Sequence, residues 1–467
     1  MLTTNHGLKR ELRLRDLVLM QVALIFSLSW IGFTAKQGSS QLGLWLLAIV
    51  LFYVPLAAVV MKLSRAIPVE GGVYQWVKQG LSPFAGYMAG WNVTVAMVLF
   101  FASVGSQLAS GFAWAAGPSG AWMESSKALA LTLTALFCLV AYFINVRGLH
   151  LVKWISGTAS AFWFAVSLVL AFLLARAWLS GLPLAHTSLT LARPAFSLLT
   201  INVLAKMALG ALSGFDNSAI FAEECRKPEN DVARSVVVAA PLIALMYILG
   251  TAALLAYSRP GDIDLAAPVQ QVMHKGFGNS SLGTALAAIA VGAFSIALVA
   301  GGIIVIGMVA RLPMVAGWDG LLPAWWSELH PKYRTPSKGI AAVAAGLMIV
   351  GVLSLLGAGN QEAVQATLAV TIASLCLIYL LLFGVVLFGF RSSPLRPGLG
   401  IRLGALAAFS VTAVAFVFEI IPLGEVANPA LFAIKVTAMI CATNALGAYL
   451  YWRGRLRAAR LGAISKI

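Results

Sequence analysis

The sequence predicts an all-α protein that crosses a membrane many times, and three observations support this fold class. Of its 467 residues 60% are hydrophobic and 10% are charged, with a mean hydropathy of +0.91, which excludes an ordinary soluble domain. Apolar runs of spanning length recur from Leu17 almost to the C-terminus. Most lysines and arginines fall on one side of these runs, and this positive-inside bias places both termini in the cytoplasm.

The net charge of +16 follows the predicted topology and is not gathered on one face. We therefore expect the basic loops to lie against anionic lipid, and we expect no nucleic-acid partner. The five histidines are scattered and no phosphate-binding P-loop is present, so the sequence indicates no metal, no cofactor and no ATP-driven pump. The four cysteines also lack metal-binding or disulfide spacing; they are Cys138, Cys225, Cys376 and Cys441.

Twelve spans fit the apolar runs, and no connection between them is long enough to form a soluble domain. The whole chain, 1–467, is therefore predicted to be one transmembrane domain. The predicted cores are 16–36, 42–64, 84–113, 126–146, 153–175, 198–222, 233–257, 283–309, 339–358, 364–390, 400–422 and 429–452.

Two of the twelve spans are interrupted by small or polar residues. In the first span the interruption comprises Ser27, Leu28, Ser29, Trp30, Ile31 and Gly32. In the sixth it comprises Gly210, Ala211, Leu212, Ser213, Gly214 and Phe215. Small residues also serve plain helix packing in membranes, but an interrupted backbone in hydrocarbon is tolerated where it lines a site.

The two interruptions lie five spans apart, and this spacing predicts an inverted-repeat secondary transporter. Repeat one would cover about 16–175 and repeat two about 198–390.

Three sequence blocks in order resemble the amino acid–polyamine–organocation (APC) transporter superfamily, and specifically its bacterial amino acid permeases. The first is a PxxGGxYxW-type loop beginning at Pro68. The second is the SGFDNxAxxAEExxxP block from Ser213 to Pro228, and the third is the RxxxxxxxDGxLP segment from Arg311 to Pro323. Each block alone is weak, but the ordered set covers nearly the whole chain.

The resemblance implies a leucine-transporter-like fold in the bacterial inner membrane, with two added helices at about 400–452 after the two repeats. It also implies that a small-molecule substrate binds between the two interruptions. Amides at a half-helix N-terminus in 27–32 would bind a carboxylate, and 210–215 would face it. Many relatives place a gating aromatic ring at the position of Gly210. Trp30 and Phe215 are the two candidates to replace that ring, and the transported molecule is left open.

Candidate coupling or gating residues lie in and beside the sixth span. Asp216 is an acidic residue at the interruption with Asn217 next to it, and Lys206 lies about one turn before Gly210. A proton-coupled carrier needs such a titratable group in its pathway. The alternatives are that Asp216 caps a half-helix N-terminus and that Lys206 snorkels towards the outer surface.

The absence of suitable hydroxyls in the second half of span eight favours sodium independence. The sodium-coupled members use hydroxyls there, and between Val291 and Ala310 this chain has only Ser295. In some relatives a span-five lysine fills the sodium position, where this chain has Ser160.

The sequence therefore predicts a sodium-independent secondary transporter of amino acids or related amines, working as a proton symporter or an exchanger (antiporter). Two alternatives stay open. One is a sensor or subunit of the same fold that does not transport. The other is a membrane-embedded enzyme, which would need clustered catalytic residues that the sequence does not show. The oligomeric state is not indicated.

Overall fold

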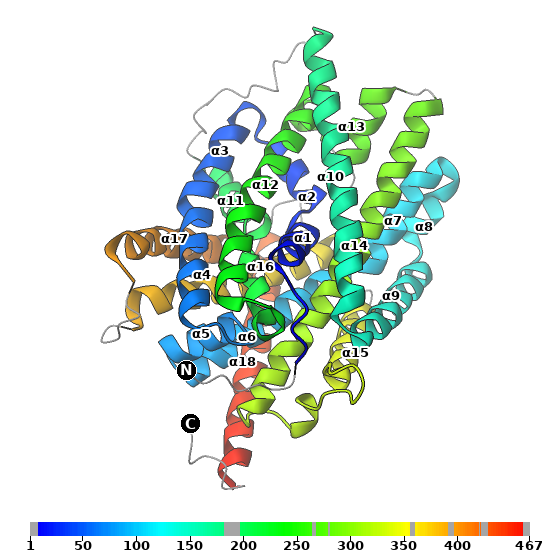
Figure 1. The fold of residues 1–467 in the computed structure, drawn as a ribbon. Coiled ribbons are helices and arrows are strands. Elements are labelled where there is room, and N and C mark those ends of the chain that lie inside the picture. Colours follow the sequence, from blue (N-terminus) through cyan, green and yellow to red (C-terminus); the bar gives the residue numbers. More distant parts are fainter. Residues whose placement is uncertain are drawn as a thin grey trace.

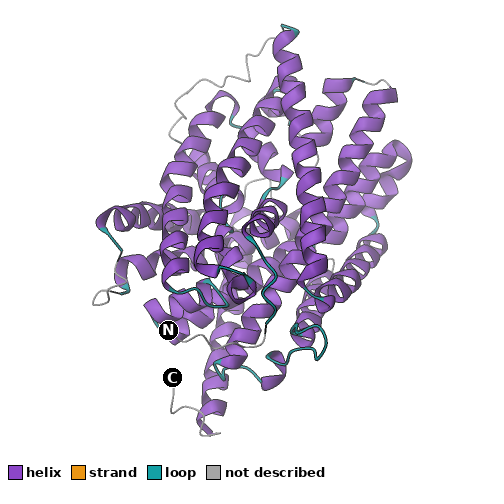
Figure 2. Ribbon diagram, viewed as in Figure 1, coloured by secondary structure: helices purple, strands orange, loops and turns teal. Residues whose placement is uncertain are grey.

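The computed structural model describes residues 8–181, 197–263, 268–278, 281–354, 360–390, 397–419, 421 and 428–460. Among these residues the named elements of secondary structure are all helices, and loops and turns connect them, as Figure 2 shows. The one β-type pairing in the described part is an isolated parallel bridge between Leu12 and Cys225. The all-α class predicted from the sequence is confirmed.

The described residues of the first half of the chain form ten α-helices. They are α1 (Leu14–Ile25), α2 (Leu28–Ala35), α3 (Gln41–Ala48), α4 (Val54–Ala66), α5 (Val73–Gly80), α6 (Pro83–Ala102), α7 (Val104–Ala116), α8 (Ala121–Ser125), α9 (Lys127–Arg147) and α10 (Leu149–Leu179). A π-helical turn, η2 (Ile49–Tyr53), joins α3 to α4.

The second half begins with a segment of mixed helix type and continues with long helices. That segment consists of α11 (Leu198–Lys206), the π-helical η4 (Met207–Ala211) and the 3₁₀-helical η5 (Phe215–Glu224). The later helices are α12 (Pro228–Tyr257), α13 (Pro268–Phe277), α14 (Ser281–Trp318), α15 (Ser337–Ser354), α16 (Asn360–Phe388), α17 (Leu399–Phe418) and α18 (Pro429–Arg460).

Nine helices in the described residues are long and apolar enough to cross a membrane. They are Gly38–Ala66, Pro83–Ala113, Lys127–Arg147, Leu149–Leu179, Pro228–Tyr257, Gly283–Trp318, Ala366–Phe388, Leu399–Phe418 and Pro429–Arg460. The other three predicted spans fall on the two interrupted segments and on the shorter apolar helix Ser337–Leu353. The multi-pass character is therefore clear, and α14 extends beyond the predicted end of its span.

The interrupted segments lie inside the bundle. Figure 1 shows α1 near the centre of the molecule, and α1 packs against α10, α12 and α14. The second interrupted segment reaches the first at both ends, because η4 contacts α2 and η5 contacts α1. The two unusual stretches of sequence are therefore neighbours in space.

The first interruption consists of only two extended residues. Phe26 (φ −70°, ψ 122°) and Ser27 (φ −139°, ψ 132°) separate α1 from α2. The discontinuity expected in this span is present, but its extent was wrong, because Leu28 to Gly32 belong to α2. One polar residue after an aromatic residue suffices to break the helix here, and the following residues resume it.

The second interruption follows the π-helical turn η4. Leu212, Ser213 and Gly214 lie between η4 and η5. Gly214 has φ +91°, a conformation that a residue with a Cβ rarely adopts. The glycine therefore lets the chain leave the helix axis and start the tighter η5.

The glycine-rich loop before α5 packs directly on η5. Gly72 precedes α5 with φ +45°, and a Cβ there would lie 2.9 Å from the carbonyl carbon of Ala219. Because that neighbouring atom belongs to the backbone, a change of side-chain rotamer cannot remove the clash. The paired glycines are therefore needed for close approach as well as for the turn.

We predict that Gly72→Ala lowers the melting temperature of the purified protein. Backbone strain at positive φ alone costs roughly 1–3 kcal/mol, and the contact with Ala219 adds to it. The matched control is Gly157→Ala in α10, where an added Cβ meets nothing within 4 Å; it should leave the melting temperature unchanged or raise it. Equal melting temperatures for the Gly72 variant and the wild type would contradict this account.

Candidate functional site

A cavity of about 100 Å³ lies between the two interruptions. Ser27 contributes to its wall from the first interruption, and Ser213 and Gly214 contribute from the second. A volume several times the roughly 10–15 Å³ needed for one water gives room for a small molecule. The wall is completed by residues of α6, α7, α10, α14 and α16, among them Phe100, Phe101, Gln107, Trp163, Phe294 and Thr371.

A buried tyrosine in α12 satisfies the backbone at the first interruption. The hydroxyl of Tyr247 accepts a hydrogen bond from the amide of Ser27 at 3.0 Å and donates one to the carbonyl of Ile25 at 2.9 Å. Backbone groups without a helical partner are costly away from water. This one hydroxyl therefore supplies a hydrogen-bond partner to both an amide and a carbonyl at the break in the helix.

A tyrosine in α16 occupies the equivalent place at the second interruption. The hydroxyl of Tyr379 accepts from the amide of Gly214 at 2.8 Å and donates to Oδ1 of Asp216 at 2.8 Å. Asp216 is 1% exposed. The carboxylate predicted to serve coupling or gating is therefore linked through one hydroxyl to the backbone of the interruption.

The place beside Gly210 is filled by the indole ring of Trp30. A Cβ built on Gly210 would lie 2.0 Å from Cζ2 of that ring, so no larger residue fits there while Trp30 keeps its position. Phe215, the other candidate for the missing ring, packs against Tyr53 with ring centroids 5.3 Å apart. Of the two, Trp30 lines the cavity.

The predicted site residues divide into three groups. Those that line the cavity are Ser27, Trp30, Gly210, Ser213, Gly214 and Asn217. Those described elsewhere in the two interrupted segments are Ile31, Gly32, Ala211, Leu212, Phe215 and Asp216. The side chains of Leu28, Ser29 and Lys206 lie outside the described part of the structure.

Sequence reasoning missed both tyrosines and the aromatic part of the wall. Tyr247 and Tyr379 lie within long apolar runs, and nothing in those runs indicates which group each tyrosine hydroxyl contacts. The available signal is that a buried tyrosine hydroxyl needs a partner, and two interrupted helices supply such partners.

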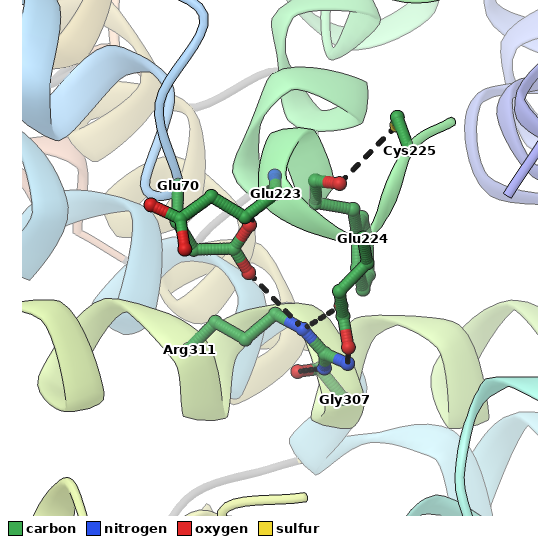
Figure 3. A network of polar contacts seen from close by, with 7 residues as sticks. Glu70, Glu223, Glu224, Cys225, Gly307 and Arg311 are labelled. Atoms are coloured by element: carbon green, nitrogen blue, oxygen red, sulfur yellow. Dashed lines mark hydrogen bonds and ion pairs between the residues drawn. The ribbon is translucent and has the colours of Figure 1, made fainter. Parts of the chain in front are cut away.

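The three blocks that carry the family resemblance meet away from the cavity, in a buried charge cluster (Figure 3). Arg311 of α14 donates from Nε and Nη2 to the carboxylate of Glu224 at 2.6 and 2.8 Å. Its Nε lies 3.5 Å from Oε1 of Glu70, and its guanidinium stacks 4.5 Å from the ring centroid of Phe221. Glu70 also accepts a hydrogen bond from the amide of Glu223 at 2.9 Å.

A second contact joins the first and third blocks. Tyr74 donates to Oδ2 of Asp319 at 2.6 Å, and Nζ of Lys78 lies 2.7 Å from Oδ1 of the same carboxylate. Burial is the largest cause that raises the pKa of Tyr74, followed by the charge of Asp319. The hydroxyl therefore stays protonated and remains a donor.

The segment before α1 is attached to the same cluster. The amides of Glu11 and Leu12 donate to the carbonyl of Glu224 at 2.9 and 3.0 Å, and the amide of Arg226 donates to the carbonyl of Leu12 at 2.9 Å. Lys153 of α10 donates to the carbonyl of Glu11 at 2.6 Å. Five parts of the chain therefore meet here, because the segment before α1 and Lys153 of α10 join the three sequence blocks.

A model of the amino acid permease family matches residues 12–442. The chain belongs to this family. The match includes all three sequence blocks and both interrupted segments, and it confirms the superfamily inferred from the motifs. The permeases of this family are membrane transporters, so the enzyme alternative is excluded.

Curated relatives of this permease include both amino acid and polyamine carriers. An uncharacterized transporter of Legionella pneumophila is 23% identical over 84% of each chain. The aspartate/glutamate permease AcaP of Lactococcus lactis is 23% identical, over 70% of this chain and 69% of that one. The low-affinity putrescine importer PlaP of Escherichia coli is 28% identical, over 67% and 66% respectively.

The charge cluster should make the stability of the fold depend on pH. Burial raises the pKa of Glu70 well above its usual range, and the nearby charge of Glu224 adds to the effect, while Arg311 opposes it. A carboxyl with a raised folded-state pKa binds more protons when folded than when unfolded. Its contribution to stability is therefore lost as the pH rises from the ordinary glutamate pKa of about 4.3 through the raised folded value.

We predict that Glu70→Gln reduces the fall in melting temperature over that pH range, measured by thermal unfolding of the purified permease. Glu224→Gln should instead lower the melting temperature itself, because leaving the buried charge of Arg311 without this partner costs about 3–5 kcal/mol. Glu328→Gln, at an exposed ion pair with Lys338, is the control. A Glu70→Gln profile parallel to the wild type would show that Glu70 is ionised throughout.

Proposed function

We propose that this permease is a secondary active transporter of amino acids or related amines that works by alternating access. The observation that carries the proposal is the cavity between two interrupted helices, one in each half of the chain. Interrupted helices with a shared site are the arrangement by which inverted-repeat transporters bind their substrates. The bacterial family of carriers supports a place in the inner membrane.

The proposed architecture is the leucine-transporter-like fold with twelve spans. Three further spans, formed by the two interrupted segments and α15, would be added to the nine helices of spanning length to give twelve. Repeat one would end with α10 and repeat two with α16, while α17 and α18 would be the added pair. The first described residues and the end of α18 lie towards the same end of the bundle (Figure 1), which supports two termini on one side, the cytoplasmic side.

The substrate would bind to the backbone of the interruptions. The first turn of α2 begins at Leu28, and the side chain of Ser27 makes no capping hydrogen bond to that turn. The backbone amides of the first turn can therefore bind a carboxylate. Carbonyls released at the breaks can bind an ammonium group. Ser213, Gly214 and Asn217 would complete the site from the second interruption.

Coupling is proposed to depend on Asp216, assisted by Asn217 and Lys206. The hydrogen bond from Tyr379 to Asp216 connects protonation of this carboxylate to the Gly214 amide, because the same hydroxyl accepts from that amide. A buried, titratable group next to the site suits sodium-independent proton symport or exchange. A relative of Lactococcus lactis, 22% identical over about half of each chain, is named a probable agmatine/putrescine antiporter, which supports exchange.

We predict that the purified permease in liposomes exchanges a labelled amino acid for an internal one. Asp216→Asn should reduce the exchange or the proton-driven uptake roughly tenfold or more, because a hydrogen bond to a charged group contributes about 1.5–3 kcal/mol. Gly214→Leu should abolish it, since leucine fits poorly at φ +91°. Ser410→Ala, at an exposed hydroxyl bonded within α17, is the control.

Full exchange in both variants would contradict the site assignment. The non-transporting sensor or subunit of the same fold remains the second candidate function. It predicts ligand-dependent thermal stabilisation without any exchange, so the two measurements together separate it from a carrier.

A further inference from the structure

The wall of the cavity carries no ionisable side chain among the described residues that line it. Its polar side chains are neutral, namely Ser27, Gln107, Ser213, Asn217 and Thr371 besides the indoles of Trp30 and Trp163. Asp216 does not line the cavity, and its Oδ1 accepts from Tyr379. The described part of the wall therefore offers polar groups for hydrogen bonds but no residue that could neutralise a charged side group.

One side of the cavity is a continuous aromatic surface. Phe26 meets Trp163 edge to face with ring centroids 5.2 Å apart, and Trp163 meets Phe294 at 6.1 Å. These rings come from α10, α14 and the first interruption, so they lie beside the backbone that would hold the substrate's charged groups. Such a surface binds apolar groups through dispersion and burial.

Charge decides which substrates this surface can accept. The two charges of an amino acid zwitterion can be met by the backbone groups of the interruptions. A further charge on the side group would enter the cavity without a partner, and burying an unpaired ion costs several kcal/mol. AcaP and PlaP, by contrast, are named for aspartate or glutamate and for putrescine, which carry a charge at each end.

We propose that this permease carries a neutral amino acid with an apolar side chain and that Trp30 limits the size of that side chain. This inference rests on the proposed function, since it assigns the substrate class of the same cavity. The aromatic surface of Phe26, Trp163 and Phe294 receives the side chain. The charged groups of the substrate face the interruptions.

Trp30 limits the size because it occupies the space above Gly210. The ring is 6% exposed and lines the cavity, while any Cβ at Gly210 would collide with it. A smaller residue at position 30 frees volume inside the cavity. A larger residue at position 210 pushes the indole out of its place and into the substrate's space.

The test is a counterflow assay in liposomes with the full-length permease. Labelled alanine, leucine and phenylalanine represent the neutral apolar class, and aspartate, lysine and putrescine represent charged side groups. We expect exchange of at least one neutral amino acid and at least tenfold weaker exchange of every charged compound. Efficient exchange of aspartate, lysine or putrescine would overturn the inference while leaving the proposed transport function intact.

Exchange of none of the six compounds, with no thermal stabilisation by any of them, would overturn both the substrate class and the proposed function. The putrescine arm also tests an alternative role for the rings, because aromatic faces can bind ammonium groups by cation–π attraction. A preference for putrescine over all neutral amino acids would establish that role instead.

Variants of Trp30 and Gly210 test the size limit. Trp30→Ala should shift the ratio of kcat/KM for phenylalanine over alanine upwards by roughly tenfold, the effect of about one methylene in an apolar pocket. Gly210→Ala should shift the ratio downwards. Trp30→Phe, which keeps a ring, should give an intermediate ratio and provides a readout if the alanine variant fails to fold. Unchanged ratios in the folded variants would show that Trp30 does not limit substrate size.

Discussion

The structure depends on the pairing of backbone groups where two buried helices are broken. Away from water, an amide or carbonyl without a partner is costly, so a transporter can keep such breaks only if something binds the released groups. Here the hydroxyls of Tyr247 and Tyr379 each use their donor and their acceptor at one break. These hydrogen bonds stabilise the non-helical backbone at both breaks, on either side of the cavity.

The charge cluster imposes a second constraint at one end of the same segments. Arg311 is 3% exposed; it pairs with the carboxylate of Glu224 and lies 3.5 Å from the carboxyl group of Glu70, and these two groups come from two other parts of the chain. Separating these parts would leave the buried guanidinium without a carboxylate, because its remaining hydrogen bond goes to the carbonyl of Gly307 in its own helix. Any motion that separated these parts of the chain would have to break the contacts of the cluster, so their strength would oppose such a motion.

Much of the fold, and the presence of two interrupted helices that lie next to each other, could be predicted from the sequence. Apolar length and charge bias gave a multi-pass helical protein, and the small polar residues marked both interruptions. The extent of the first was wrong because Leu28 to Gly32 are compatible with helix once Ser27 is bound by Tyr247. The meeting of Glu70, Glu224 and Arg311, and the placement of Trp30 over Gly210, depend on tertiary packing that spacing along the chain does not encode.

Cysteine labelling tests most directly whether the cavity between the two breaks is the substrate site. Cys441 is exposed and the other three cysteines are buried, so the Cys441→Ser variant is the background for labelling. In this background, Ser213→Cys places a thiol in the cavity wall. Ser410→Cys places a thiol on the exposed face of α17 and is the control. The account predicts that a transported substrate slows thiol labelling at position 213 and leaves labelling at position 410 unchanged. Labelling at position 213 that is unaffected by a saturating, transported substrate would contradict it.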